Sequence, residues 1–281
     1  MNFRNRKLGV LVAGLMGLAA TLPASADLPG LEGDEWLGYF VGFKNKKYQF
    51  AITSQGKTTL RVIGEKGEPL NQMMTILVEF LVEETQPDGK STAKYIKAES
   101  LESAQPATNK PQQMVIRGKV TGDAGFEAFV SEDRGVISLG GRLLDPGTLT
   151  NPTRFSIRLK VPKAYPYAKA AGNKKEEKEQ KDKMKDDRLQ LSWTDGKRVK
   201  LSADKAVDAS SAEINGPGIS AMQVEFSTYE KRKLELIASP NSMIKLSGNQ
   251  AAPLHDGFTI TWVADPAKDP DAKARLSFEV K

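Results

Sequence analysis

Carboxylates and aromatic rings are the side chains of this sequence best suited to chemistry, because it has no cysteine and one histidine. The absence of thiols excludes cysteine nucleophiles and thiolate metal sites, and a single imidazole excludes multi-histidine zinc sites. That histidine, His255, precedes Asp256 in a turn, where adjacent side chains do not naturally face each other as triad partners do. The sequence also lacks phosphate-binding glycine loops, the dinucleotide fingerprint and the serine nucleophile elbow. We therefore predict no cofactor and favour a role without catalysis.

A carboxylate-dependent enzyme acting on polysaccharide is the alternative, since glycosidases need only two acidic side chains flanking a bond. Six acidic residues lie on or beside expected strands, namely Glu79, Glu83, Glu127, Asp133, Glu225 and Glu235. Their spacing singles out no pair. Alternation along the strand places Glu79 and Glu83 together on its polar face, which indicates a solvated face rather than a catalytic site.

A loop near the C-terminus is the weak candidate for a metal site. Its three carboxylates, Asp265, Asp269 and Asp271, offer the oxygen ligands that calcium prefers. The spacing matches no EF-hand, Lys268 competes for the carboxylates, and two prolines stiffen the loop. The pattern favours a plain proline turn, so we predict no metal.

Aromatic residues are the candidate binding groups, because exposed Trp and Tyr rings on β-sheets can stack on sugar rings. Tyr165 and Tyr167 flank a proline in a connecting segment, and Trp36 lies in an aromatic-rich stretch. Alternatively, Trp36, Trp193 and Trp262 belong to strand cores, and the two tyrosines pack against a domain junction.

The fold class follows from alternation of apolar and polar residues over short runs separated by Gly and Pro. Examples are Met114 to Val120, Phe155 to Val161 and Leu276 to Val280. Short strands at this spacing are typical of sandwiches and barrels. The ambiguous segment Met73 to Glu84 is assigned to a strand from its Ile, Val and Phe content. We predict an all-β protein of antiparallel β-sandwich-like modules.

A charged run divides these strands into two groups. Residues 174–188 contain seven basic and six acidic side chains, with Met184 the one large apolar residue. Such a segment cannot bury enough surface to form a core, although acid–base pairs four residues apart permit a local helix. We predict two β-rich domains, 27–166 and 189–281, joined by a charged linker over 167–188. Matching hairpins around residues 50–62 and 189–201 raise the hypothesis of a duplication.

The N-terminus has the pattern of a secretory signal peptide over residues 1–26. Basic residues at positions 4, 6 and 7 precede the apolar run Leu8 to Leu22, and Ala24-Ser25-Ala26 supplies the small residues of a cleavage site. Later apolar runs are too short for a transmembrane helix. An exported chain without disulfides suits the bacterial periplasm or cell surface. The formal net charge of +6 falls to about +3 without this segment, which is too weak to indicate nucleic acid.

These observations predict an exported, non-catalytic β-sandwich protein of the bacterial envelope or cell surface. Its partner is expected to be a protein or a glycan. The alternatives are the carboxylate-dependent enzyme described above and a β-barrel carrier of an apolar ligand, which would need a lined cavity inside a closed sheet.

Overall fold

The protein is almost entirely β-sheet in the computed structural model, which describes residues 28–33, 35–165 and 174–281. The predicted signal peptide and Tyr167 therefore lie outside the described residues. The strands are β1 (Tyr39–Lys44), β2 (Tyr48–Thr53), β3 (Thr58–Val62), β4 (Ile76–Thr85), β5 (Ser91–Tyr95), β6 (Met114–Lys119), β7 (Gly125–Asp133), β8 (Val136–Asp145), β9 (Thr153–Val161), β10 (Arg188–Trp193), β11 (Arg198–Ser202), β12 (Ile219–Glu225), β13 (Lys233–Ala238), β14 (Ser242–Gly248), β15 (Phe258–Ala264) and β16 (Leu276–Val280).

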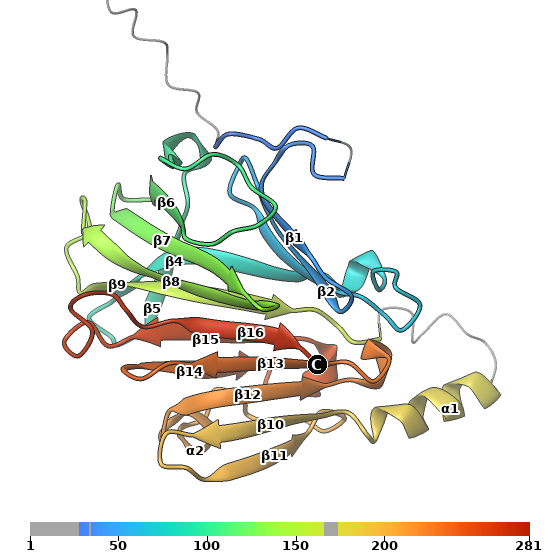
Figure 1. Cartoon of the computed structure of the whole chain (residues 1–281). Helices are drawn as coiled ribbons and strands as arrows, with labels where there is room; N and C mark the ends of the chain where they lie inside the picture. The colour runs from blue at the N-terminus through green and yellow to red at the C-terminus, as the bar shows by residue number, and fades with distance from the viewer. Residues whose placement is uncertain (1–27, 34, 166–173) are drawn as a thin grey trace, which may run out of the picture.

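Helices are short and few among the described residues. The α-helices are α1 (Lys174–Met184) and α2 (Ala212–Asn215), and the 3-10 turns are Gln72–Met74, Ala98–Ser100, Ser227–Tyr229 and Leu254–Asp256. Helix α1 forms within the charged run and projects from the sheet (Figure 1). None of these helices is long and apolar enough to cross a membrane.

All the named strands join one curled sheet, and the strand pairs are antiparallel. Its main order is β1-β2-β3-β4-β9-β15-β14-β12-β13-β16-β8-β7-β6, with β5 beside β4 and the β10–β11 hairpin beside β12. Strands from both sides of the charged run pair directly, because β15 lies along β9 and β16 along β8. The prediction of an all-β antiparallel protein is thus confirmed. The prediction of two separate sandwich modules is not, since one hydrogen-bonded sheet spans both halves.

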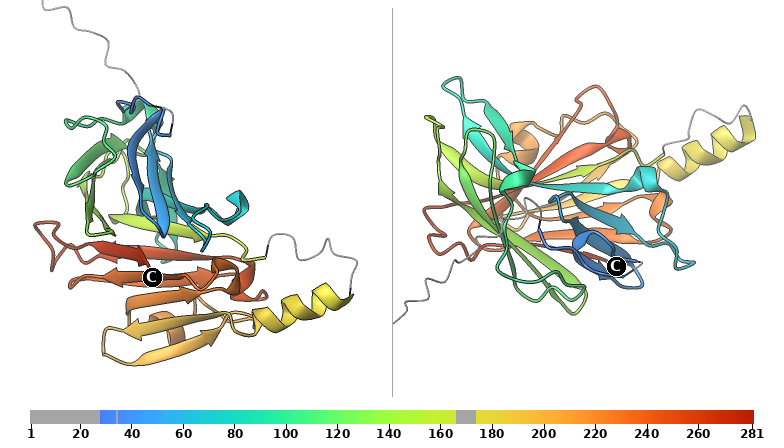
Figure 2. Two further views of the ribbon diagram at one scale, coloured as in Figure 1. Left: turned by 45° about the vertical axis from the view of Figure 1, so that its right-hand side comes forward. Right: turned by 90° about the horizontal axis from the view of Figure 1, so that it is seen from above.

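The first half curls so that its two outer edges are linked by one segment, residues 101–111. The backbone of Thr108 exchanges hydrogen bonds with β1, at 3.0 Å to Gly42 and 2.9 Å to Phe40. The backbone of Glu102 exchanges two with Arg117 on β6, at 3.0 and 2.9 Å. Figure 2 shows β1 to β3 and β6 to β8 as two walls that face each other. The segment satisfies backbone groups that edge strands would otherwise leave unpaired.

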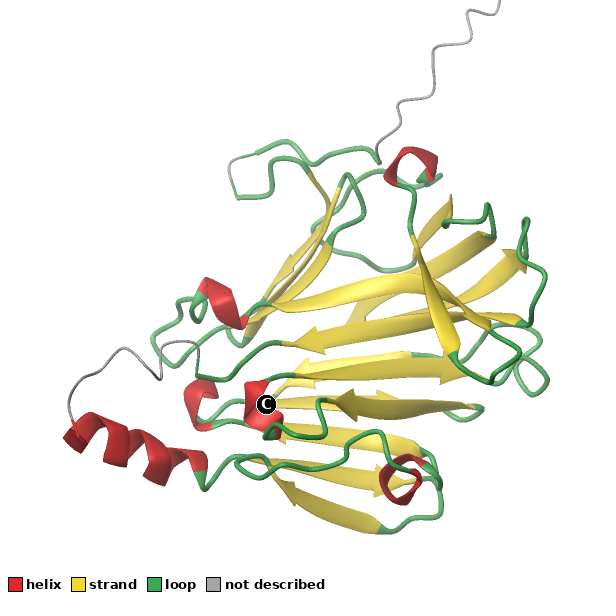
Figure 3. Ribbon diagram, turned by 180° about the vertical axis from the view of Figure 1, so that it is seen from behind, coloured by secondary structure: helices red, strands yellow, loops and turns green. Residues whose placement is uncertain are grey.

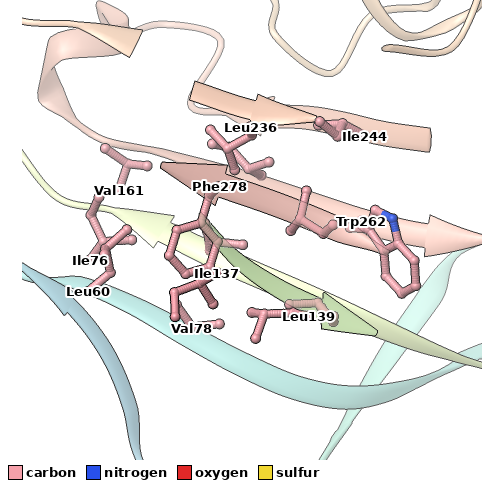
Figure 4. Close-up of a cluster of buried hydrophobic side chains, with 14 of the residues drawn as sticks. Leu60, Ile76, Val78, Ile137, Leu139, Val161, Leu236, Ile244, Trp262 and Phe278 are labelled. Atoms are coloured by element: carbon pink, nitrogen blue, oxygen red, sulfur yellow. The ribbon is translucent and has the colours of Figure 1, made fainter. Parts of the chain in front are cut away.

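The space inside the curl is filled by side chains from both halves. Phe50 of β2 packs on Phe278 of β16 at 5.7 Å between ring centroids, and Phe155 of β9 stacks between Phe80 and Phe126 at 6.3 and 6.1 Å. Figure 4 shows part of this shared cluster. Because these strands derive from distant parts of the sequence, the core depends on both halves together.

The two hairpins that suggest a duplication place their apolar faces differently. In the β2–β3 hairpin, the last strand residue hydrogen-bonded across the turn is Thr53, which directly follows the buried Ile52. In the β10–β11 hairpin, the corresponding residue is Trp193, which lies two residues after the buried Leu191. Since successive side chains point to opposite faces of a strand, the two apolar faces lie on opposite sides relative to their turns. The resemblance is therefore one of alternation and not of a shared hairpin structure.

Candidate anion-binding site

Basic and hydroxyl side chains are aligned across three neighbouring strands, β9, β15 and β14, on the outer face of the sheet, beside acidic residues of β4. In β9, Phe155, Ile157 and Leu159 point into the core, so that the intervening residues point outward. The strand register then places Glu79 of β4 opposite Arg158 of β9, Arg158 opposite Thr261 of β15, and Thr261 opposite Lys245 of β14. The next row contains Lys160, Thr259 and Ser247.

One wall above this face is formed by the segment around α2. Strand β14 pairs with β12 at Ile244 alone, which leaves its later backbone groups available. The Asn215 side chain takes a strand's place there, since its amide donates to the Leu246 carbonyl at 2.7 Å and accepts from the Leu246 amide at 2.8 Å. The Ser211 hydroxyl caps the helix by accepting from Ile214. Seen from behind, α2 lies over the sheet (Figure 3).

The sheet face and this wall enclose a pocket of about 680 Å³, which we call the Lys245 pocket. Its charged lining residues are Glu83, Arg154, Arg158, Lys160 and Lys245, and hydroxyls of Ser210, Ser247, Thr259 and Thr261 complete much of its polar surface. Among the described lining residues, four cations therefore accompany a single carboxylate.

Ion pairs neutralise only part of this charge. Glu83 is 6% exposed and accepts from Arg154 at 2.7 Å, while Arg158 lies 3.5 Å from its other oxygen. Lys160 is paired with Glu79 at 2.7 Å. The carboxylates thus hold the guanidinium groups in place, but the pocket retains a net positive charge.

Lys245 is the unneutralised cation of the pocket. Its side chain is partly buried and makes no hydrogen bond or ion pair with any residue that the structure describes. Burial lowers the pKa of Lys245, the nearby Arg154 charge lowers it further, and Glu83 opposes both effects. A partly desolvated ammonium group beside a guanidinium gains energy from an anion placed between them. The arrangement is thus suited to binding an anionic group.

Tyr165, a residue predicted to bind ligand, is engaged within the protein. Its hydroxyl donates to the buried Asp187 at 2.7 Å, and its ring lies edge-on to His255 with 5.9 Å between centroids. Asp187 also accepts from the backbone and hydroxyl of Ser227, at 2.7 and 2.8 Å. Burial and the Asp187 carboxylate raise the pKa of Tyr165. These contacts fit the alternative that this tyrosine packs at the junction between the halves.

Trp36 precedes β1 instead of lying in it, and its indole covers Gly42. A Cβ at position 42 would come within 2.3 Å of the ring, so the glycine is required for this contact. The ring also lies edge-on to Tyr39 at 5.7 Å. Trp262 is fully buried in β15. The structure brings neither Trp36 nor Tyr165 into the Lys245 pocket.

The three carboxylates of the C-terminal loop organise the loop itself. Asp269 accepts from the amides of Lys273 and Ala274 at 2.8 and 2.9 Å, while Asp265 and Asp271 pair with Lys268 and Lys273. Within the described ranges, no group of three or more His, Asp or Glu residues is placed to hold a metal ion.

Of the charged residues in the Lys245 pocket, Glu83 was expected from the sequence on a solvated face but is buried, and the basic residues were missed because only acidic and aromatic groups were considered as candidates. A signal was present in β9, where Arg154, Arg158 and Lys160 share one parity of an alternating strand. No comparable signal marked Lys245, whose position depends on pairing between β14 and β15.

No protein-family model matches the chain, and no curated protein matches it. Among solved structures it is weakly similar to the α-N-acetylgalactosaminidase NagBb from Bifidobacterium bifidum in complex with GalNAc, with 11% identity and a TM-score of 0.49. That match covers 85% of this chain and 36% of the NagBb chain, so this chain spans about a third of the enzyme's length. The Slr1438 protein from Synechocystis sp. PCC 6803 is similar with 10% identity, a TM-score of 0.43, and coverage of 85% and 94%.

Proposed function

We propose that this chain is an exported binding protein of the bacterial envelope that holds an acidic glycan in the Lys245 pocket. The N-terminal pattern and the lack of cysteine support export to a periplasm or cell surface. The anionic groups recognised are carboxylate, sulfate or phosphate substituents on sugar units.

The observation that carries the proposal is the partly buried Lys245, which has no carboxylate partner among the described residues and lies in a pocket with three more cations. Surface lysines avoid burial by extending into water, whereas this ammonium group is partly buried and lies within reach of the Arg154 charge. A ligand anion would remove the repulsion between the two cations, and guanidinium groups bind carboxylate or sulfate through paired hydrogen bonds.

The remaining lining favours a sugar over a simple ion. Hydroxyl groups of Ser247, Thr259 and Thr261 can donate to and accept from sugar hydroxyls. The volume of about 680 Å³ lies within the range of small-molecule sites and exceeds what one inorganic ion needs. Catalysis is less well supported, since glycosidases use two carboxylates and Glu83, ion-paired to arginine, is the single carboxylate among the described lining residues.

Calorimetric titration of the purified full chain tests this proposal. We would compare a short galacturonate oligomer with a neutral galactose oligomer of equal length, and include inorganic sulfate and phosphate. The acidic oligomer should bind at least about tenfold more tightly than the neutral one. This ratio corresponds to a difference of about 1.4 kcal/mol in the free energy of binding. Sulfate or phosphate alone binding as tightly as the oligomer would indicate an ion site and not a glycan site.

Lys245→Met is the decisive variant, because it keeps the aliphatic stem and removes the charge. It should weaken binding of the acidic oligomer about tenfold or more, with an unchanged melting temperature or a higher one. Lys200→Met is the matched control, since Lys200 is an exposed strand lysine outside the pocket. Equal affinity of the Lys245 and Lys200 variants for the acidic oligomer would overturn the proposal.

A further inference from the structure

A second cluster of cations lies on the outer face of β6, β7 and β8. The register places Arg117 opposite Glu127, and Glu127 opposite Arg142. Glu127 is 3% exposed and receives Arg117 Nε at 2.7 Å on one oxygen and Arg142 Nη2 at 2.8 Å on the other. We call this cluster, with the adjoining pocket of about 510 Å³, the Glu127 site.

The Glu127 site holds two guanidinium groups in fixed positions and leaves some of their hydrogen-bond donors unused. One buried carboxylate fixes two guanidinium groups, each about half exposed, at 56% for Arg117 and 46% for Arg142. Each guanidinium has five N–H donors and uses only one or two of them on Glu127. Arg117, Glu127 and Arg142 together carry one net positive charge, which the exposed Glu102 of the same pocket offsets, so it is the free donors facing solvent that suit a second anionic group.

A groove of about 540 Å³ shares one lining residue with each of these two sites. Arg142 lines both the groove and the Glu127 site, and Arg154 lines both the groove and the Lys245 pocket. The rest of the groove's lining is largely apolar and includes Leu144, Phe155 and Pro266, and the carboxylate of Asp269 in the same lining is occupied by the backbone amides of Lys273 and Ala274. Leu144 is 47% exposed, so an apolar surface is open to a ligand there.

Guanidinium groups on both sides of an apolar groove match the chemistry of a linear acidic polysaccharide. Sugar rings present apolar C–H faces, and their acidic substituents recur along the chain at a fixed repeat. We propose that the acidic glycan is bound as an extended chain that runs from the Lys245 pocket along the groove to the Glu127 site. This inference rests on the proposed function, because it takes the Lys245 pocket as the first binding position.

Dependence of affinity on chain length tests the inference. Galacturonate oligomers of two, three, six and ten units are titrated against the full chain by calorimetry. The ten-unit oligomer should bind at least about 30-fold more tightly than the two-unit oligomer, more than the few-fold gain expected from its extra binding registers. Polyphosphate of similar length serves as a second polyanion. If polyphosphate binds as tightly as the ten-unit oligomer, the protein recognises charge alone and the inferred sugar contacts are wrong.

Two variants separate this inference from the proposed function. Arg142→Gln should lower affinity for the ten-unit oligomer about tenfold while leaving the two-unit oligomer unchanged, and Glu127 keeps Arg117 as a partner so that the fold is retained. Leu144→Glu, an exposed substitution in the groove, should have the same selective effect through charge repulsion. Arg198→Gln, on the exposed edge strand β11, is the control.

The outcomes are distinguishable. Failure of every oligomer to bind would refute the proposed function. Binding of the two-unit oligomer with no gain at ten units, or equal loss at both lengths in Arg142→Gln, would leave the Lys245 pocket as a site and refute the extended chain.

Discussion

Replacing Glu83 with Gln is expected to lower stability and raise affinity for anions at the same time. The carboxylate is buried and holds Arg154 at 2.7 Å and Arg158 at 3.5 Å. Gln keeps the side-chain volume but removes the negative charge and places an amide donor near two guanidinium groups. Breaking a buried pair costs about 3 to 5 kcal/mol. The arginines retain 33% and 19% exposure to water, so we expect a loss of about 2 kcal/mol in the free energy of unfolding.

The same change strengthens anion binding. Glu83 is the single carboxylate among the described lining residues of the Lys245 pocket, so its removal adds one unit of positive charge there. One unit charge at a partly solvated site contributes about 1 to 2 kcal/mol to the binding of an anion a few ångströms away. The short galacturonate oligomer should therefore bind about tenfold more tightly to Glu83→Gln, provided the variant is measured well below its melting temperature.

Glu225→Gln is the matched control. Glu225 is 11% exposed, pairs with Arg188 at 2.6 Å and Lys233 at 3.2 Å, and lies on β12 outside the Lys245 pocket. Its loss should lower the melting temperature by several degrees, as for Glu83, without changing anion affinity. Thermal unfolding by circular dichroism and calorimetric titration measure the two effects. Weaker anion binding in Glu83→Gln, with Glu225→Gln unchanged, would show that Glu83 accepts hydrogen bonds from the ligand and would refute this reasoning.

Two further predictions concern alkaline stability and the charged run. Burial raises the pKa of Tyr48, Tyr165 and Tyr229 above the ordinary 10.0, so ionisation favours the unfolded chain and stability should fall as pH rises above 10. Urea unfolding midpoints measured between pH 8 and 11.5 test this prediction. Tyr48→Phe should make the pH dependence of the unfolding free energy shallower by the equivalent of about one proton. A midpoint that stays constant over this pH range would contradict the prediction. Trypsin cleavage within α1 should leave two fragments that co-elute, because β9 pairs with β15 and β8 with β16. Fragments that separate and keep their β-sheet spectra would instead establish two independent modules.

The sequence by itself determined the class of fold. Alternation in segments such as Thr153–Val161 predicts strands with one apolar and one polar face, and the structure places Ile157 in the core and Arg158 outside. Depletion of apolar residues likewise predicts that residues 174–188 lie outside the core, which fits the projecting helix α1 but not the end of the run, where Asp187 is buried and Arg188 begins β10. Both conclusions depend on local pattern alone, because side-chain direction along a strand has a fixed period of two residues.

Only the tertiary structure decided which strands meet, and the site depends on those pairings. Alternation places Arg158 and Lys245 each on a polar face, but nothing in either strand specifies that both will flank Thr261 of β15. The linear sequence also suggests a boundary at the charged run, whereas pairing of β9 with β15 carries the sheet across it. Edge pairing between segments distant in the sequence is selected by packing of the whole core, so the Lys245 pocket is a property of the assembled sheet and of no single strand.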